Sequence, residues 1–532
     1  MSGQGATATL QPTLHTYETG ARRIIITLTV IVSAMLELID TTIVNVAITQ
    51  ISGNLGASIE DVAWVVTSYA IANVIVIPLS GFLGNLLGRR NYYIGSILLF
   101  TAASLLCGVA TDIWTLVFFR FLQGIGGGAL LPTSQAILYE TYPPEDRGKA
   151  TGIFSMGLVL GPTIGPLLGG YLVDYFSWEW CFFVNIPVGL LAAWSAFSFI
   201  REPKTRHKVT SIDWTGIGLL ALGIGSLQFI LERGESKDWF ETPYITWFTI
   251  IAVVSLLVFV WWELRVEEPA VDLSVLGRSH NLAIAAVLTF VVGYGLYGSL
   301  FVFPVFVQHL LGFSALLTGM VLFPSAMVTG MIALPLGIAL QRGASAKILM
   351  TVGMAAFALF CWELGQQTMQ SGAANFFWIL LLRGIALGFI FIPVTMLAVA
   401  GLHGKDIGQA TGLNNMVRQL GGSFGIAITN TYIVKRVAEH RTELLSHLSP
   451  YDPAAVERLN GIAQAAQSRM ISPAEAQQAS LKALEGTLTA QSYHLAYMDA
   501  FMLIALLFAL SMPLLLFIKI RKGDKADLSQ AH

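Results

Sequence analysis

Charged residues are scarce in this chain. Only 12% of its 532 residues are Asp, Glu, Lys or Arg, while 55% are hydrophobic, and an ordinary soluble domain carries about 25% charged residues. The scarcity excludes a soluble globular domain and indicates a protein whose solvent is the lipid bilayer. The net charge of -2 leaves no basic footprint, so no nucleic-acid partner is predicted.

Cysteine and metal-binding motifs are also lacking. The three cysteines, Cys107, Cys181 and Cys361, do not have the spacing of metal ligands, and neither a DxD nor an HExxH motif occurs. These absences argue against a disulfide scaffold and against a membrane-embedded enzyme. We predict no enzyme activity, no metal and no cofactor.

Long apolar segments are abundant. A helix needs about 20 mostly apolar residues to cross a bilayer, and fourteen segments meet this requirement. The chain is therefore predicted to be an all-α polytopic membrane protein. The expected spans are roughly 24–46, 62–83, 92–111, 113–137, 149–173, 180–200, 212–232, 245–263, 281–304, 315–340, 347–366, 376–400, 408–432 and 497–519.

The second half of the chain repeats the first. The segment GKATGIFSMGLVLGPTIG at 148–165 reappears as GQATGLNNMVRQLGGSFG at 408–425, with identity at eight positions. The repeat pairs span 5 with span 13, a shift of eight spans, so the arrangement is six plus two plus six helices. Duplicated membrane bundles of this kind usually form transporters, with the substrate site between the halves.

Positive charge predicts the orientation, because Lys and Arg accumulate on the cytoplasmic side of a membrane. Nineteen of the 30 Lys and Arg residues fall on one side of the fourteen spans, and the short loops on the other side hold only Arg233 and Lys237. Both termini are therefore expected in the cytoplasm. The predicted division is an N-terminus (1–23), a six-helix bundle (24–200), two inserted helices with flanking loops (201–280), a second six-helix bundle (281–519) with an external loop (433–497), and a tail (520–532).

A few ionisable residues lie inside the predicted spans, where each costs about 2.5–3.5 kcal/mol and is a functional candidate. Glu37 and Asp40 in span 1 are three residues apart and share a helix face. Proton coupling is one interpretation of these carboxyl groups, and a hydrogen bond to a neighbouring helix is the alternative. Arg120 in span 4 cannot lose its charge, so it either responds to the protonation state of Asp40 or clamps helix ends. Arg383 is its mate in the repeat.

Two motifs are candidates for conformational change. The first, at the end of span 2, contains Gly81, Asn85, Gly88, Arg89 and Arg90; its arginines can bond exposed carbonyl groups at helix ends. The second, in span 5, contains Gly157, Gly161, Pro162, Gly165, Pro166, Gly169 and Gly170. Glycines at four-residue intervals let another helix approach closely. This packing is either a seal between conformational states or a static contact.

A transported molecule needs an apolar cavity with a few polar anchors. We expect the substrate to contact Tyr69, Asn73, Gln123, Gln135, Tyr294, Tyr297, Asn414 and Arg418.

The loop 433–497 is unusually long for a connection between helices. Asp452-Pro453 and Ser472-Pro473 both have the pattern of a helix N-cap followed by proline, and Glu475 completes a capping box with Ser472. Two helices outside the membrane are therefore predicted.

The motifs together resemble a known family. The stretch Leu38-Ile-Asp40-Thr-Thr-Ile-Val-Asn45-Val-Ala47, the motif at 81–90, the Arg120 segment, the span 5 motif and Phe183-Val-Asn185-Ile-Pro187-Val-Gly189 resemble the fourteen-span drug:proton antiporter family (EmrB/QacA type) of the major facilitator superfamily. The segment 225–234 and the long loop resemble its EmrB branch. One departure is Asn85, where the family usually has aspartate.

The resemblance implies a major facilitator fold in a bacterial inner membrane, and a proton-coupled multidrug efflux antiporter that exports amphipathic or lipophilic compounds by alternating access. It implies that Asp40 couples protons together with Arg120, the proton being the only coupling ion. It also implies that a periplasmic adaptor and an outer-membrane channel are partners, with the periplasmic loop 433–497 as the dock; a cap over the exit is the alternative for this loop. Export of one endogenous metabolite or siderophore is the alternative function.

Overall fold

The computed structural model describes residues 17–202, 211–278, 280–399, 402, 405–446, 448, 451, 453–467 and 472–518. Most of the predicted N-terminal segment (1–16), the predicted tail (520–532) and the N-cap predicted at Asp452 lie outside these residues. The described chain is helical and contains no strand.

The helices are α1 (Gly20–Leu55), α2 (Ile59–Leu87), α3 (Arg89–Gly108), α4 (Ile113–Thr141), α5 (Arg147–Tyr175), α6 (Trp180–Phe183), α7 (Asn185–Phe199), α8 (Trp214–Arg233), α9 (Pro243–Glu263), α10 (Ser274–Arg278), α11 (His280–His309), α12 (Ala315–Gln341), α13 (Ala346–Leu364), α14 (Ala373–Val399), α15 (Lys405–Ser446), α16 (Pro453–Gln467) and α17 (Pro473–Ser511). Short 3-10 turns are η1 (Pro144–Asp146), η2 (Glu235–Lys237), η3 (Trp239–Glu241) and η4 (Met512–Phe517).

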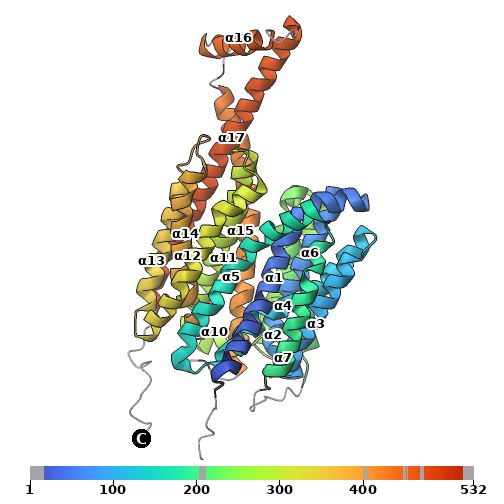
Figure 1. Ribbon diagram of the computed structural model, residues 1–532, viewed down its shortest axis with the longest axis vertical. Helices are drawn as coiled ribbons and strands as arrows, with labels where there is room; N and C mark the ends of the chain where they lie inside the picture. The colour runs from blue at the N-terminus through green and yellow to red at the C-terminus, as the bar shows by residue number, and fades with distance from the viewer. Residues whose placement is uncertain are drawn as a thin grey trace, which may run out of the picture.

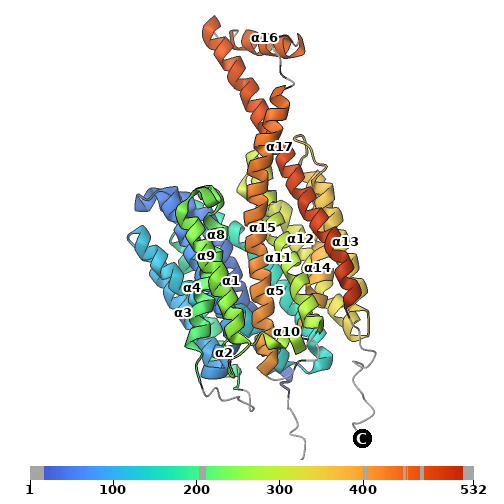
Figure 2. The ribbon, with the colours of Figure 1, turned by 180° about the vertical axis from the view of Figure 1, so that it is seen from behind.

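Fourteen membrane-spanning helices agree with the structure. Thirteen segments of the described chain are long and apolar enough to cross a membrane. The remaining predicted span, 408–432, lies within α15, which packs along α11 and runs the length of the assembly (Figure 2). Because α15 contains polar residues such as Asn414 and Asn415, its hydropathy is lower than that of the thirteen apolar segments.

The helices form two groups, each with its own hydrophobic core. Two clusters of buried side chains consist of residues from α1–α7, from the connections between these helices and from the chain just after α7. A larger cluster consists of residues between 288 and 518. Figure 1 shows α1–α4, α6 and α7 on one side, α11–α14 and α17 on the other, and α5 crossing between them. The inserted helices α8 and α9 pack on each other, and α8 also packs on α2 and α15 at the back of the assembly (Figure 2).

Close contacts between the two groups lie at one end of the molecule, which we call the Arg89 end. There α5 packs on α12 and α2 packs on α15. A Cβ added to Gly148 would lie 2.5 Å from the carbonyl oxygen of Gly337, and one added to Gly81 would lie 2.9 Å from that of Gly408. Only glycine allows this approach, because its backbone carries no side chain. The opposite end, where α16 lies, is the α16 end.

The long external segment contains the predicted helices, but they are longer than expected. The capping box of Ser472 and Glu475 is present and starts α17, and α16 begins at Pro453. The expected separate helix and span 497–519 are one 39-residue helix, α17, because no proline follows Pro473 within it and the single glycine, Gly486, does not break the Ala- and Leu-rich helix. Pro513 then follows the end of α17, and residues 512–517 form η4.

Span 6, predicted at 180–200, is confirmed as an apolar segment at Trp180–Phe199. It consists of the short α6 and of α7, which begins at Asn185. Pro187 lacks an amide hydrogen and lies in the first turn of α7, where that hydrogen has no partner within the helix.

Candidate functional site

A buried ion pair joins α1 to α4. Nη1 of Arg120 lies 2.5 Å from Oδ2 of Asp40, and the two side chains are 1% and 0% exposed. Two charges removed from water are tolerated only when they are paired and hydrogen-bonded. The predicted relation between Asp40 and Arg120 is therefore a direct contact in the structure.

Neutral groups complete the surroundings of the pair. Oδ1 of Asp40 accepts hydrogen bonds from Nε2 of Gln123 at 2.8 Å and from Nδ2 of Asn185 at 2.9 Å. Arg120 donates to the carbonyl oxygen of Val65 at 3.2 Å, and its guanidinium lies 4.2 Å from the centre of the Tyr69 ring. The arginine therefore keeps several favourable contacts even when the carboxylate loses its charge.

Glu37 lies one helical turn before Asp40 and is held separately. Its Oε1 accepts from Nδ2 of Asn73 at 3.0 Å, and its Oε2 accepts from the backbone amide of Leu131 at 3.2 Å. No ion pair of Glu37 occurs within the described residues. The two carboxyl groups of span 1 thus have different direct partners: Asp40 contacts a guanidinium group, and Glu37 contacts neutral groups.

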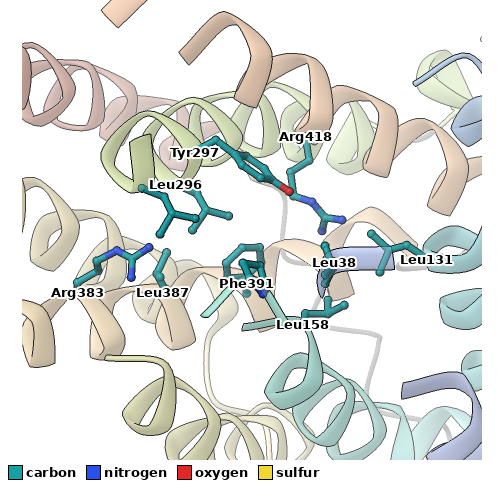
Figure 3. Close-up of a pocket in the computed structure, with 11 residues that line it drawn as sticks. Leu38, Leu131, Leu158, Leu296, Tyr297, Arg383, Leu387, Phe391 and Arg418 are labelled. Carbon is teal, nitrogen blue, oxygen red and sulfur yellow. The ribbon is translucent and has the colours of Figure 1, made fainter. Parts of the chain in front are cut away.

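An apolar pocket lies between the two groups of helices. It contains about 560 Å³ of empty volume, including the part open to solvent. Its lining comes from α1, α4, α5, α11, α14 and α15 and consists of Leu38, Leu131, Leu158, Pro162, Leu296, Tyr297, Leu300, Arg383, Leu387, Phe391 and Arg418. Figure 3 shows Arg383 and Arg418 on opposite sides of Leu387 and Phe391.

The predicted substrate contacts are distributed over three places. Tyr297 and Arg418 line the pocket. Tyr69, Asn73 and Gln123 surround the charged groups of α1 and α4. The other three make polar contacts elsewhere: Gln135 accepts from Asn415 across the two groups at 2.7 Å, Asn414 accepts from Thr289 at 2.8 Å, and Tyr294 pairs with Thr429 at 3.3 Å. Substrate contact by these residues stays a prediction.

The motif at the end of span 2 is bonded to residues that were not predicted. The backbone amides of Arg89 and Arg90 donate to the carboxylate of Glu202 at 2.8 and 3.1 Å, and the Arg89 guanidinium pairs with Glu140. Arg90 donates to the carbonyl oxygen of Phe197 at 2.6 Å, near the end of α7, as expected for an arginine at a helix end. Gly88 has a φ of +89°, which favours glycine.

The span 5 glycines contact α1, within the same group of helices. A Cβ on Gly161 would lie 2.8 Å from Cβ of Leu38, and one on Gly165 would lie 3.0 Å from the carbonyl oxygen of Ile39. The close helix approach that the sequence predicted is present. The contact with α12 across the groups is made instead by Gly148, which precedes this motif.

Three residues that bond directly to the predicted groups were not predicted from the sequence. Asn185 was quoted only as part of a family motif, and Glu140 and Glu202 carried no signal because they lie at the ends of predicted spans. Asn185 could have been found as a neutral amide in an apolar span, since such groups need a polar partner in lipid.

These features define a multi-pass membrane transporter, with two helical bundles, buried charges and an apolar pocket between the bundles. The family profile described as the Major Facilitator Superfamily matches residues 30–426. The multidrug export protein EmrB of Escherichia coli K12 is 35% identical over 440 residues, which cover 82% of this chain and 85% of EmrB. The fatty acid resistance protein FarB of Neisseria gonorrhoeae is 32% identical over 498 residues, covering 93% and 96%.

The chain therefore belongs to the Major Facilitator Superfamily and is of its EmrB type. Solved structures show the same fold at low identity. The human organic anion transporter MFSD10 has a TM-score of 0.61 at 14% identity, covering 93% of this chain and all of that one. The proton:xylose symporter XylE has a TM-score of 0.56 at 15% identity, covering 91% and 95%. The protein is a transporter and not an enzyme.

Proposed function

We propose that the protein exports amphipathic or lipophilic compounds, including drugs, in exchange for protons. Two observations support export of such compounds: the apolar pocket between the bundles, and the relatives whose names describe multidrug export and fatty acid resistance. The bundles 24–200 and 281–519 alternate access to this pocket from the two sides of the membrane.

The ion pair of Asp40 and Arg120 is the observation that supports proton coupling. In the described conformation both carboxyl oxygens of Asp40 accept hydrogen bonds, from Arg120, Gln123 and Asn185. A proton that binds to Asp40 removes the charge, weakens the contact with Arg120 and frees α1 to shift against α4. Release of this proton on the other side of the membrane restores the pair and completes the cycle.

The closed Arg89 end fits one state of such a cycle. Contacts of α5 with α12 and of α2 with α15 close this end, and the positive-inside rule assigns it to the cytoplasm. In this proposal both termini are cytoplasmic, the membrane is a bacterial inner membrane, and the described state is closed toward the cytoplasm.

The energetics permit this coupling. One charge that moves through 100 mV supplies about 2.3 kcal/mol, and a tenfold concentration gradient costs about 1.4 kcal/mol. One proton per cycle therefore sustains a gradient somewhat above tenfold from the voltage alone, and a pH difference adds to it.

The helices beyond the α16 end are the proposed dock for a periplasmic adaptor that leads to an outer-membrane channel. Asp499 joins α17 to α15 by accepting from Arg436 at 2.5 Å and from His440 at 2.8 Å, and Arg441 pairs with Glu485 at 2.6 Å. Both views show α16 at the tip of this projection, away from the bundles (Figures 1 and 2). That position supports a dock over a cap.

The proposed coupling is tested with purified protein in sealed proteoliposomes. Replacing Asp40 with Asn is expected to abolish substrate-driven proton movement while preserving exchange of substrate at equilibrium. Asp174→Asn is the matched control, since Asp174 is an exposed carboxylate of α5. Proton movement of wild-type size in the Asp40→Asn protein would overturn the assignment.

A further inference from the structure

Among the described residues, the lining of the pocket between the bundles contains positive charge and no acidic residue. Arg383 and Arg418 are its only ionisable residues within this part of the chain, apart from the phenol of Tyr297. Both arginines are largely buried, at 6% and 7% exposed. No ion pair of either arginine occurs within the described chain.

Hydrogen bonding leaves most of these two guanidinium groups unoccupied. A guanidinium carries five N–H donors. Within the described residues, Arg383 donates one hydrogen bond, to Oγ of Ser325 at 3.3 Å, and Arg418 donates one, to Oδ1 of Asn415. Each guanidinium therefore has donors left for a bound molecule.

Acidic groups near the pocket form no ion pair with these arginines within the described residues, although the charge of Glu37 attracts Arg418 over a longer distance. Glu37 is the nearest candidate, because its neighbour Leu38 and its hydrogen-bond partner Leu131 both line the pocket. Its carboxyl oxygens, however, bond to Asn73 and to the amide of Leu131. Asp40 is occupied by Arg120.

We infer that the pocket binds anionic amphipathic molecules, with a carboxylate or sulfonate held by Arg418 or Arg383 and an apolar chain along the leucines and Phe391. Arginine cannot be deprotonated to avoid a charge in an apolar site, so a ligand anion is the partner that compensates it. Charge-assisted hydrogen bonds from arginine to such oxygens are among the strongest in proteins. A lipophilic cation would instead face two like charges. The inference rests on the proposed export function and names its substrate class.

The test compares two probes with the same alkyl chain and opposite permanent charge, 1-octanesulfonate and octyltrimethylammonium. Both keep their charge at all relevant pH values and so do not cross lipid by protonation. Binding is measured by equilibrium dialysis of the full-length protein in nanodiscs, with empty nanodiscs as the blank. We expect the sulfonate to bind at least about ten times more tightly than the ammonium probe.

Variants assign the preference to the two arginines. At least one of the two variants Arg383→Gln and Arg418→Gln is expected to weaken sulfonate binding by about tenfold or more, and Arg418→Lys is expected to retain more of it than Arg418→Gln. Arg265→Gln is the control, since Arg265 is exposed and stacks on Trp261 outside the pocket. Size-exclusion profiles and thermal stability identify any variant that fails to fold. If a glutamine variant fails to fold, sulfonate binding by the Arg418→Lys protein still tests the inference.

Two results would overturn the inference: equal or tighter binding of the ammonium probe, or sulfonate binding that both glutamine variants leave unchanged. Transport of the two probes in proteoliposomes separates this failure from that of the proposed function. If only octyltrimethylammonium is exported in exchange for protons, the proposed export function is supported and the inferred anionic substrate class is wrong. If neither probe moves protons, the proposed function loses its support as well.

Discussion

Arg120 and Asp40 are 80 residues apart in the chain, and Nη1 of the arginine lies 2.5 Å from Oδ2 of the aspartate. The contact ties α4 to α1 in a part of the bundle that excludes water, because both side chains are buried. Neutral amides of Gln123 and Asn185 share the aspartate. A change of one proton on this carboxyl group therefore alters the strongest polar contact between the two helices.

Removing one partner of the pair is expected to destabilise the protein more than removing both charges. Arg120→Ala leaves a buried carboxylate without its counter-ion, a loss of about 3–5 kcal/mol. In the double variant Arg120→Ala with Asp40→Asn, we expect much of this loss to be recovered. Thermal unfolding in detergent, followed by tryptophan fluorescence, measures both. A double variant no more stable than Arg120→Ala alone would contradict the pairing.

The glycine face of α5 is expected to tolerate substitution at only some positions. A Cβ at Gly165 would overlap the Thr42 hydroxyl and approach the carbonyl oxygen of Ile39, whereas nothing lies within 4 Å of a Cβ at Gly170. Gly165→Ala should therefore cost about 1–3 kcal/mol, and Gly170→Ala should leave the unfolding temperature within experimental error. Equal stability of the two variants would show that α1 and α5 are not in this close contact.

The closed Arg89 end is expected to open when its backbone contact is obstructed. A side chain at Gly337 would overlap the backbone of Gly148, so Gly337→Ala should weaken the packing of α12 on α5 and raise the population of the opposite state. The measurement is the alkylation rate of a single cysteine introduced at Ser155, a buried residue of α5, in a background with the native cysteines removed. The control is Gly319→Ala, because nothing lies within 4 Å of a Cβ added at Gly319. Gly343→Ala is unsuitable, because the φ of +95° at Gly343 strains any residue other than glycine. An unchanged rate would indicate that this contact does not hold the end closed.

The projection beyond the α16 end is expected to matter in cells but not in vesicles. Arg441 and Glu485 are hydrogen-bonded, so residues 442–484 can be replaced by a short Gly/Ser linker while the contacts of Asp499 with Arg436 and His440 remain. We expect normal proton-coupled transport in proteoliposomes and loss of drug resistance in cells. A defect in both assays would favour a cap over the exit, and normal behaviour in both would argue against the adaptor dock.

Sequence reasoning predicted the fold and the charged pair well, for physical reasons. Burial of ionisable groups in lipid is costly, so Asp40 and Arg120 stood out against the apolar background, and the repeat and the span lengths indicated the helix count. The neutral amide of Asn185 gives a weaker signal than a charged group, and its contact with Asp40 was not predicted. Gln123 was predicted from polarity alone to contact substrate, and only the packing of α4 on α1 reveals its bond to Asp40.

Contacts between the bundles could not be predicted from the sequence. The approach of Gly148 to Gly337 depends on how two separately packed bundles face each other, and no local pattern encodes that arrangement. The same holds for the pocket, which is lined by Arg383 of α14, Arg418 of α15 and residues of α1 and α5.

The central claim is that substrate export is driven by protons. In sealed proteoliposomes that contain the full-length protein, uphill movement of 1-octanesulfonate or ethidium is followed while nigericin and valinomycin in symmetric potassium remove both the pH difference and the voltage. The account predicts that uphill movement stops and that only equilibration of the probe remains. Accumulation against a gradient at an undiminished rate under these conditions would contradict it.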